Sequence, residues 1–280
     1  MFKPYLSRWN LIPDGDPIVT RSSYLLPVRM DGHINGNPAM LKIAMDAEEK
    51  LGGLVMQWWK GDGAARVYAY EGNALLMERA QGINSLMEMA CQGQDDEASR
   101  ITCNVIAKLH KPRSAAPPGL IPLNIWFEAL ELAAQHEGGV LLESLAVARE
   151  LLASPRDIVV LHGDVHLENV LDFGSRGWLA IDPKRIIGER GYDYANLLCN
   201  PELPTATDPI RFIRQFHVIS QAANLERRRL LQWTLAYAGL SASWFLEDDD
   251  RQNADLELSI AALALQTLST EANNHDGIHK

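Results

Sequence analysis

The chain has 280 residues, 47% apolar and 22% charged, which is typical of a globular protein with one large or two small domains. Its net charge of −10 disfavours nucleic acid and anionic membranes as partners and is compatible with a cationic small molecule. No apolar stretch is long enough to span a membrane, the amino terminus lacks a signal-peptide pattern and the three cysteines are scattered, so we expect a cytoplasmic protein with no membrane partner.

Strands dominate the first eighty residues. Apolar and β-branched runs predict strands at 23–29 and 39–44, separated by the turn-forming segment DGHINGNP. Apolar residues at helical spacing predict a helix over 46–59. Two further strands are expected at 66–70 and 74–78, around the turn Glu-Gly-Asn.

Helical patterns take over from Ala80. Helices are predicted at 95–110, 125–135 and 140–153, and helices dominate again after Tyr192. The expected fold is therefore α+β and bilobal. A small β-rich lobe would span residues 1–79, and a larger helical lobe would span 80–280. A cleft between two such lobes is a natural ligand site.

The most informative segment is LHGDVHLENVLDFGSRGWLAIDP, residues 161–183. It follows a short predicted strand at 158–161 and contains a predicted hairpin of strands 170–173 and 178–181. Asp164 and Asn169 have the D-x-x-x-x-N spacing of a kinase catalytic loop. This spacing makes Asp164 the candidate base and Asn169 a candidate magnesium ligand, with His162 bracing the loop.

The second magnesium carboxylate is expected to be Asp182, at the end of the returning strand. A hairpin brings that end back beside Asn169, whereas Asp172 lies at the far end. The literal kinase tripeptide Asp172-Phe173-Gly174 is therefore interpreted as part of the turn. The functional counterpart is Asp182-Pro183-Lys184.

Nucleotide binding requires a cation under the phosphates, and Lys42 in the strand AMLKIA is the candidate. Its partner would be a glutamate on the following helix, with Glu49 favoured over Glu48. Backbone groups from Glu78 to Ala80 are expected to meet the adenine edge. The alternatives are that Lys42 protects an edge strand and that both glutamates are ordinary helix N-terminal charges.

His162 and His166 could alternatively bind zinc. The two histidines lie in a predicted loop and not four residues apart on a helix, as in HExxH, so this alternative is less favoured.

The segments HGDVHLENVL and AIDPKRIIGERGYDYANLL resemble the aminoglycoside phosphotransferases, and with LAYAGLSASW they are most similar to the streptomycin 6-phosphotransferase and hydroxyurea-resistance kinase branch. The resemblance extends over about residues 22–264. It implies a protein-kinase-like fold, ATP, Mg²⁺ and phosphorylation of a small-molecule hydroxyl. In such a fold the lobe 1–79 would bind nucleotide, and the lobe 80–280 would hold the catalytic and substrate-binding groups. By position the resemblance implies that Asp164 is the base, that Asn169 and Asp182 bind Mg²⁺, and that Lys42 with Glu49 holds the phosphates.

Two departures from the family pattern matter. Ser22-Ser23 stands where a glycine-rich phosphate loop is expected, so phosphate binding there would depend on backbone amides. Asp193, in ERGYDYAN, is interpreted as a structural carboxylate that ties the catalytic loop, in preference to a substrate ligand.

The predicted acceptor is a cationic, hydroxyl-rich small molecule, with streptomycin first. The candidate substrate-binding residues are Glu189, Trp244, Glu247 and Asp248, with Asp249 and Asp250 in the same acidic run. The alternative for that run is a solvated turn between helices. Hydroxyurea, an amino alcohol or a sugar are alternative acceptors, and a nucleotide-binding pseudokinase is an alternative of another class. The sequence leaves open which hydroxyl is modified.

Overall fold

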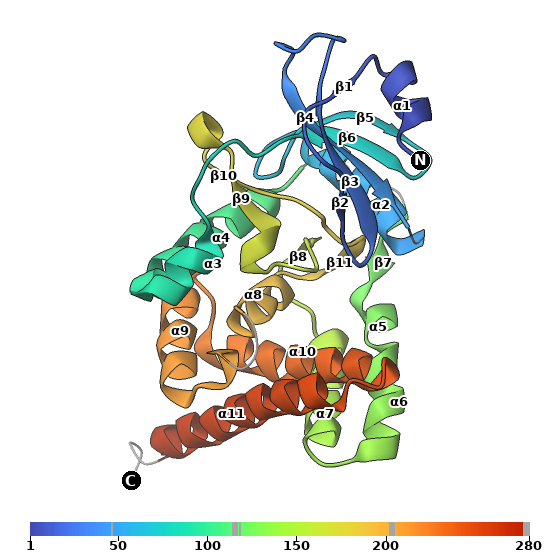
Figure 1. Ribbon diagram of the computed structural model, residues 1–280. Helices are drawn as coiled ribbons and strands as arrows, with labels where there is room; N and C mark the ends of the chain where they lie inside the picture. The colour runs from blue at the N-terminus through green and yellow to red at the C-terminus, as the bar shows by residue number, and fades with distance from the viewer. Residues whose placement is uncertain (46, 114–116, 118, 202–204, 277–280) are drawn as a thin grey trace.

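Alternating burial toward the end of β3 (Ser23–Arg29) explains why the sheet has one face against a core: Leu26 and Val28, two residues apart, are buried on the same face. The computed structural model describes residues 1–45, 47–113, 117, 119–201 and 205–276, with the side chains of 47–49 and 272–276 outside the description. Figure 1 shows this sheet above a larger helical part.

The amino-terminal sheet is six-stranded and antiparallel, with the order β1-β3-β4-β6-β5 and β2 paired with β3. The predicted strands at 23–29 and 39–44 pair in register from Ser23 opposite Ala44 to Arg29 opposite Pro38. The other strands are β1 (Ile12–Pro13), β2 (Ile18–Val19), β4 (Pro38–Ala44), β5 (Val67–Glu71) and β6 (Ala74–Glu78).

Two helices accompany the sheet, α1 (Lys3–Arg8) and α2 (Ala47–Trp59). The apolar side of α2 places Val55, Met56 and Trp59 in the main core. The predicted helix at 46–59 is thus confirmed from residue 47, while Asp46 lies outside the described residues.

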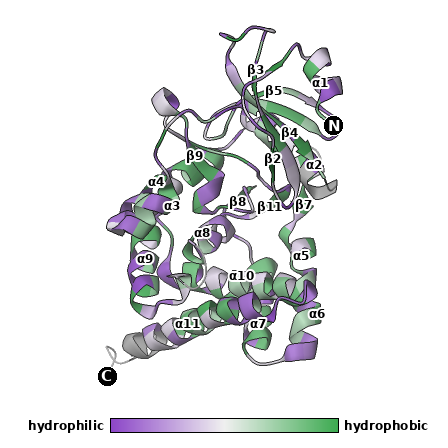
Figure 2. Cartoon of the chain, viewed as in Figure 1, coloured by the Kyte–Doolittle hydropathy of each residue, from purple (hydrophilic) through white to green (hydrophobic). Residues whose placement is uncertain are grey.

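The helical part is centred on α10, which packs against α7, α8 and α11. Almost every residue of α10 from Arg229 to Ser243 is buried, since neighbours surround this helix. Hydrophobic residues, green in Figure 2, recur along the sheet strands and along α10 and α11. The helices are α3 (Leu86–Met89), the π-helical turn η1 (Ala90–Gln94), α4 (Asp95–Leu109), α5 (Leu123–Trp126), α6 (Glu128–Glu137), α7 (Val140–Ala153), α8 (Gly191–Leu198), the 3₁₀ turn η4 (Thr205–Thr207), α9 (Pro209–Ala222), α10 (Arg227–Glu247) and α11 (Arg251–Asp276).

Short strands lie between the two parts and carry the loops of the site. β9 and β10 form the predicted hairpin, and β11 pairs with both β8 and β7. The elements are β7 (Ile121–Pro122), β8 (Ile158–Val160), the 3₁₀ turn η2 (Leu167–Asn169), β9 (Val170–Asp172), the 3₁₀ turn η3 (Gly174–Arg176), β10 (Trp178–Ala180) and β11 (Ile186–Glu189).

Two expectations differ from the structure in detail. The single helix predicted at 125–135 is two helices, because Phe127, with φ −87° and ψ 4°, ends α5 before α6 begins. β7 and β11 were not predicted, since such short strands carry too little alternation. None of the described helices is both long and apolar enough to cross a bilayer. The division at residue 79 stays a prediction.

Candidate active site

Asp193 on α8 holds the loop that follows β8 by hydrogen bonds to its backbone. Its Oδ2 accepts a hydrogen bond from the backbone N–H of His162 at 2.9 Å, and its Oδ1 accepts one from that of Gly163 at 2.8 Å. The Nε2 atom of His110, at the end of α4, lies 2.7 Å from the same Oδ2. Asp193 is fully buried, so a structural carboxylate tying the loop is confirmed.

Electrostatics agrees with this role for Asp193. Burial by itself raises its pKa, but the hydrogen bond from His110 and the backbone hydrogen bond from His162 act in the opposite direction, and the pKa stays below its ordinary value. The carboxylate is therefore ionised when it accepts the backbone N–H groups. Such charge-assisted hydrogen bonds are stronger than neutral ones and position the loop firmly.

His162 braces the loop from its other side. Its Nε2 lies 2.8 Å from the carbonyl oxygen of Ile181, and its Nδ1 accepts a hydrogen bond from the backbone N–H of Asp164 at 3.3 Å. Burial lowers the pKa of this imidazole, so it is neutral and carries its proton on Nε2. The ring thereby links the residue before Asp182 to Asp164, as the predicted bracing role requires.

Asp164 itself faces outward from this braced loop. Its side chain is 37% exposed and lines a cavity of about 360 Å³ in the helical part of the molecule. The side-chain amide of Asn169 donates a hydrogen bond to the backbone oxygen of Asp164 at 2.9 Å. The backbone is therefore fixed while the carboxylate remains accessible, the arrangement that a base acting on a bound hydroxyl requires.

The β9–β10 hairpin places the two candidate magnesium aspartates in different surroundings. Trp178 pairs with Asp172 at its far end, whereas the N–H of Ile181 donates to the carbonyl of Asn169 at 2.9 Å, which places Asp182 beside Asn169. Asp172 instead accepts hydrogen bonds from Asn84 at 2.6 Å and from the backbone of Gly174 at 2.8 Å. The predicted hairpin is confirmed, and Asp172 belongs to its turn.

Lys42 lies in the middle of β4 and reaches across to the hairpin. Its side chain is only 5% exposed, and Nζ lies 2.7 Å from Oδ1 of Asp182. Asp182 has a φ of 54°, an uncommon conformation for a residue other than glycine. Lys42 is thus an interior residue of the sheet and not an edge-strand charge. The side chains of Glu48 and Glu49 lie outside the described residues, so the predicted lysine–glutamate pair stays a prediction.

Asn169 and Asp182 together offer the kind of donors that Mg²⁺ takes. The amide nitrogen of Asn169 is committed to Asp164, which leaves its Oδ1 to accept a ligand, and the Asp182 carboxylate is 28% exposed. One amide and one carboxylate oxygen are sufficient, because protein-bound Mg²⁺ commonly completes its shell with water and phosphate oxygens. Among the residues that the structure describes, no cluster of three or more histidines, cysteines and acidic residues forms a metal site, so the zinc alternative lacks a ligand set.

The segment expected to meet adenine begins at the end of β6. The backbone N–H of Glu78 donates to the carbonyl of Arg66 at 2.8 Å, and its carboxylate pairs with Arg176. These contacts engage the N–H and the side chain of Glu78, and the predicted role of its backbone in nucleotide binding stays a prediction. Ala80 lies in the segment that follows β6, and its role in nucleotide binding stays a prediction.

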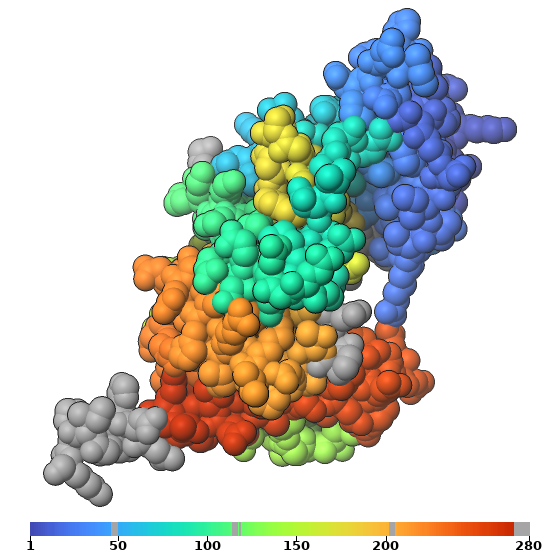
Figure 3. All heavy atoms as spheres, turned by 60° about the vertical axis from the view of Figure 1, so that its left-hand side comes forward, coloured from blue at the N-terminus to red at the C-terminus, as the bar shows by residue number. Residues whose placement is uncertain are grey.

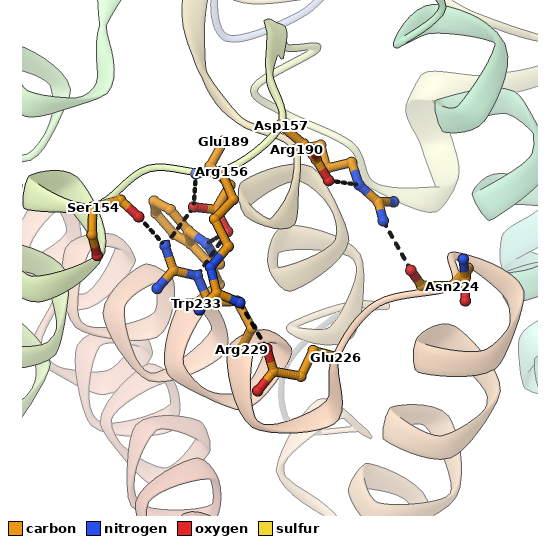
Figure 4. A network of polar contacts seen from close by, with 9 residues as sticks. All are labelled: Ser154, Arg156, Asp157, Glu189, Arg190, Asn224, Glu226, Arg229 and Trp233. Atoms are coloured by element: carbon orange, nitrogen blue, oxygen red, sulfur yellow. Dashed lines mark hydrogen bonds and ion pairs between the residues drawn. The ribbon is translucent and has the colours of Figure 1, made fainter.

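Glu189 lies in an internal network and not on the wall of the Asp164 cavity (Figure 4). It is 3% exposed and accepts two hydrogen bonds from Arg229, at 2.9 and 2.7 Å, one from Trp233 at 2.7 Å and one from the backbone of Arg156 at 2.8 Å. Both carboxylate oxygens are therefore occupied. The prediction that Glu189 binds substrate was wrong, because β11 directs this side chain toward α10.

The prediction that Trp244 and the acidic run from Glu247 to Asp250 bind substrate also differs from the structure. Trp244 packs edge-on against Trp126, with ring centroids 5.7 Å apart, and neither Trp244, Glu247 nor Asp248 lines the cavity beside Asp164. Asp248 pairs with Arg21, in the turn between β2 and β3, and Figure 3 shows that blue turn reaching the far end of α10. Asp250 accepts hydrogen bonds from Asn253 at the start of α11. The run is thus a turn between helices, as the alternative interpretation held.

Two functional candidates were missed by the sequence analysis, Glu257 on α11 and His110 at the end of α4. Glu257 lies on the cavity wall and is 6% exposed. A signal was available: Glu257 is the acidic member of a helical face otherwise formed by Ala254, Ile260, Ala261 and Ala264, all of them buried. A lone carboxylate on such a face is unusual enough to mark a site.

Comparisons with known proteins agree with this geometry. Residues 8–249 match the family model described as aminoglycoside/hydroxyurea antibiotic resistance kinase. A streptomycin 3''-kinase of Klebsiella pneumoniae is 47% identical, over 94% of this chain and all of that protein. A streptomycin 6-kinase of Streptomyces griseus is 31% identical, over 91% of this chain and 85% of that protein.

Among solved structures, the chain is similar to the aminoglycoside phosphotransferase APH(3'')-Id of Streptomyces rimosus in complex with ADP and streptomycin. The TM-score is 0.54 at 16% identity, covering 86% of this chain and 98% of that one. At this identity the likeness concerns the fold, and it confirms the predicted protein-kinase-like architecture.

Proposed function

The chain belongs to the aminoglycoside/hydroxyurea antibiotic resistance kinases, and from that premise we propose that it phosphorylates a hydroxyl of streptomycin with ATP and Mg²⁺. Phosphotransferase activity toward an aminoglycoside follows from the named relatives. Streptomycin and the 3'' hydroxyl are our narrower assignment. The relative at 47% identity is a 3''-kinase, whereas the 6-kinase of Streptomyces griseus is 31% identical.

The observation that carries the proposal is the position of Asp164 between two regions. On one side lie Asn169, Asp182 and Lys42, and on the other the cavity that Asp164 lines together with Glu257. A phosphoryl-transfer site requires that phosphates and acceptor meet at one carboxylate. Asp164 meets that requirement.

In the proposed reaction Asp164 accepts a hydrogen bond from the acceptor hydroxyl and orients its oxygen toward the γ-phosphorus of ATP. A new oxygen–phosphorus bond forms while the bond from the γ-phosphorus to the bridging oxygen of ADP breaks, and the hydroxyl proton passes to Asp164. Asn169 and Asp182 would hold Mg²⁺, which neutralises the phosphate charge when bound. Lys42 would hold the phosphates, and it lies 2.7 Å from Asp182.

The test is transfer from ATP to streptomycin, with the phosphorylated position located by mass spectrometry and NMR. Asp164→Asn should lower kcat by about 10²–10⁴-fold and leave nucleotide binding unchanged, because the lost function is that of a general base. Turnover of the variant within threefold of the unaltered protein would remove Asp164 from this role. A product carrying phosphate at position 6 would overturn the hydroxyl assignment.

The hairpin provides a matched pair of variants for the metal site. Asp182→Asn should severely impair use of magnesium-ATP, whereas Asp172→Asn, which removes the same charge from the same hairpin, should be mild. An acceptor panel with hydroxyurea and a neutral sugar completes the test. Transfer to either of these, without transfer to any aminoglycoside, would reject the proposal.

A further inference from the structure

The cavity beside Asp164 contains a buried carboxylate that the protein leaves half satisfied. Glu257 is 6% exposed, and its Oε1 accepts a hydrogen bond from the hydroxyl of Ser241 at 2.9 Å. Its Oε2 has no hydrogen-bond partner within the described parts of the chain. An unpaired carboxylate oxygen in a buried position is costly, and native proteins retain few of them.

A second unsatisfied acceptor lines the same cavity. The side-chain nitrogen of Asn196 donates to the hydroxyl oxygen of Tyr237 at 2.5 Å, while its Oδ1 has no partner among the described residues. Two residues that line one cavity, on α8 and α11, thus each have a buried acceptor oxygen without a donor among the described residues. They are complementary to a ligand that brings its own N–H groups.

The acidic residues that line the cavity favour a ligand with a positive charge. Asp164, Glu168 and Glu257 line it, and the lining has no lysine or arginine among the described residues. Within the same part of the chain, the one cation beside it that forms an ion pair with the lining is Lys184, with Nζ 4.0 Å from Oδ2 of Asp164. Acidic groups that line a cavity with low-dielectric walls attract cations, and a bound cation in turn favours the ionised form of Glu257.

We propose that Glu257 is a specificity-determining residue that binds a cationic N–H group of the acceptor, with Asn196 as second acceptor, and so positions the acceptor hydroxyl at Asp164. This inference rests on the proposed function and adds a residue of this chain to it. The group bound is a guanidinium or an ammonium, since both present N–H donors and a positive charge.

The ionisation of Glu257 gives the proposal a distinctive readout. Burial raises the pKa of this carboxyl to about 8, with the hydrogen bond from Ser241 offsetting only part of the effect. A cation bound to Oε2 favours the ionised form, so binding must release a proton at pH 7. The titratable groups that line the cavity with it are Cys199 directly after α8, Tyr237 on α10, and Asp164, His166 and Glu168 of the loop after β8.

Of these neighbours, Cys199 and Tyr237 remain neutral near pH 7, because burial raises both pKa values far above their ordinary ranges. Glu257→Gln removes the titration of Glu257 alone and leaves every other group in place. The difference between the two proteins therefore isolates it.

The experiment compares the unaltered protein with Glu257→Gln and with Asp255→Asn. The control removes the same charge from an exposed position on the same helix. Glu257→Gln should raise the KM for streptomycin by about 10- to 100-fold, the loss of one charge-assisted contact. The KM for ATP should not change, and Asp255→Asn should keep the streptomycin KM within twofold.

Calorimetry in buffers of different ionisation enthalpy supplies the second readout. Streptomycin binding at pH 7 should release close to one proton more from the unaltered protein than from Glu257→Gln. This measurement also tests the unaltered protein alone, in which binding without any proton release would overturn the inference.

The outcomes separate the two proposals. If streptomycin is phosphorylated and Glu257→Gln keeps its KM within twofold, the role of Glu257 is rejected and the function stands. If Asp255→Asn raises KM as much as Glu257→Gln does, the effect is a general loss of charge and the specific contact is rejected. If no aminoglycoside is phosphorylated, the proposed function fails, and the assignment of Glu257 fails with it.

Discussion

Two buried glutamates of the helical lobe, Glu189 and Glu257, have opposite environments. Both are nearly inaccessible, at 3% and 6% exposure. Glu189 accepts four hydrogen bonds, two of them from Arg229, and Glu257 accepts one, from Ser241. Both carboxylate oxygens of Glu189 accept hydrogen bonds within the protein, whereas Oε2 of Glu257 has no hydrogen-bond partner among the described residues.

The pKa values of the two carboxyls differ as their hydrogen bonds do: the one with more donors has the lower pKa. Burial raises the pKa of both carboxyls, but around Glu189 the hydrogen bonds from Arg229, the Arg156 backbone and Trp233 outweigh burial and bring its pKa below the ordinary value. For Glu257 burial prevails and the pKa rises to about 8. A buried carboxylate whose pKa is lowered by partners thus marks structure here, and one whose pKa is raised marks a candidate site.

The largest effect is expected from breaking the Glu189 network. Arg229→Ala leaves Glu189 charged, buried and without its cation, so the free energy of unfolding should fall by about 3–5 kcal/mol. Chemical denaturation at pH 7 measures it. Arg228→Ala, which removes the neighbouring exposed arginine of the same helix, should change it by less than about 0.5 kcal/mol. A similar loss in both variants would show that Glu189 does not depend on Arg229.

Substitution of Glu257 is expected to raise the free energy of unfolding at pH 7, whereas Arg229→Ala lowers it. Its folded pKa of about 8 lies above the unfolded value of 4.5, so the stability of the neutral form is fully present below pH 4.5 and is lost as the pH rises toward 8. Glu257→Gln abolishes that loss and should stabilise the ligand-free protein by about 3 kcal/mol at pH 7 and not at all near pH 4.

Thermal or urea unfolding across this pH range checks the prediction, with Asp255→Asn as the control. A Gln variant that is less stable than the unaltered protein at pH 7 would indicate that the Glu257 carboxyl is needed by the fold and would weaken the contrast with Glu189.

A smaller effect is expected when Glu189 loses its indole donor. Trp233→Phe removes the hydrogen bond to Oε1 and retains an aromatic ring, so it should cost about 1–2 kcal/mol, less than Arg229→Ala. Urea unfolding measures the loss. A double-mutant cycle with Arg229→Ala should show coupling, because both residues bond to one carboxylate. Strict additivity would mean that the contacts act independently.

The smallest effect concerns the one contact that Glu257 has. Ser241→Ala should cost about 1 kcal/mol of unfolding free energy, since a single hydrogen bond to a buried group is lost. Ser243→Ala is the matched control: its hydroxyl, also buried in α10, donates to the backbone of Gly239. Equal streptomycin KM values in the two variants would show that Ser241 does not orient Glu257.

Local pattern was sufficient for much of the fold and for the catalytic loop. The helix at 140–153 and the strands at 23–29 and 74–78 were predicted with their bounds, because residues on one apolar face are close in sequence. The same holds for the hairpin that separates Asp182 from Asp172. A hairpin's register depends on a few neighbouring residues, and from it the position of Asp182 beside Asn169 follows.

The sequence by itself determined the fold class, the braced loop after β8 and the position of Asp182 beside Asn169. Only the tertiary structure decided the surroundings of Glu189, of Glu257 and of the acidic run from Glu247 to Asp250. The partners of Glu189 come from residues 33 to 44 positions away, and Glu257 meets Ser241 across two packed helices. The environment of a carboxylate is set by which distant side chains pack around it, and no local period in the sequence records that packing.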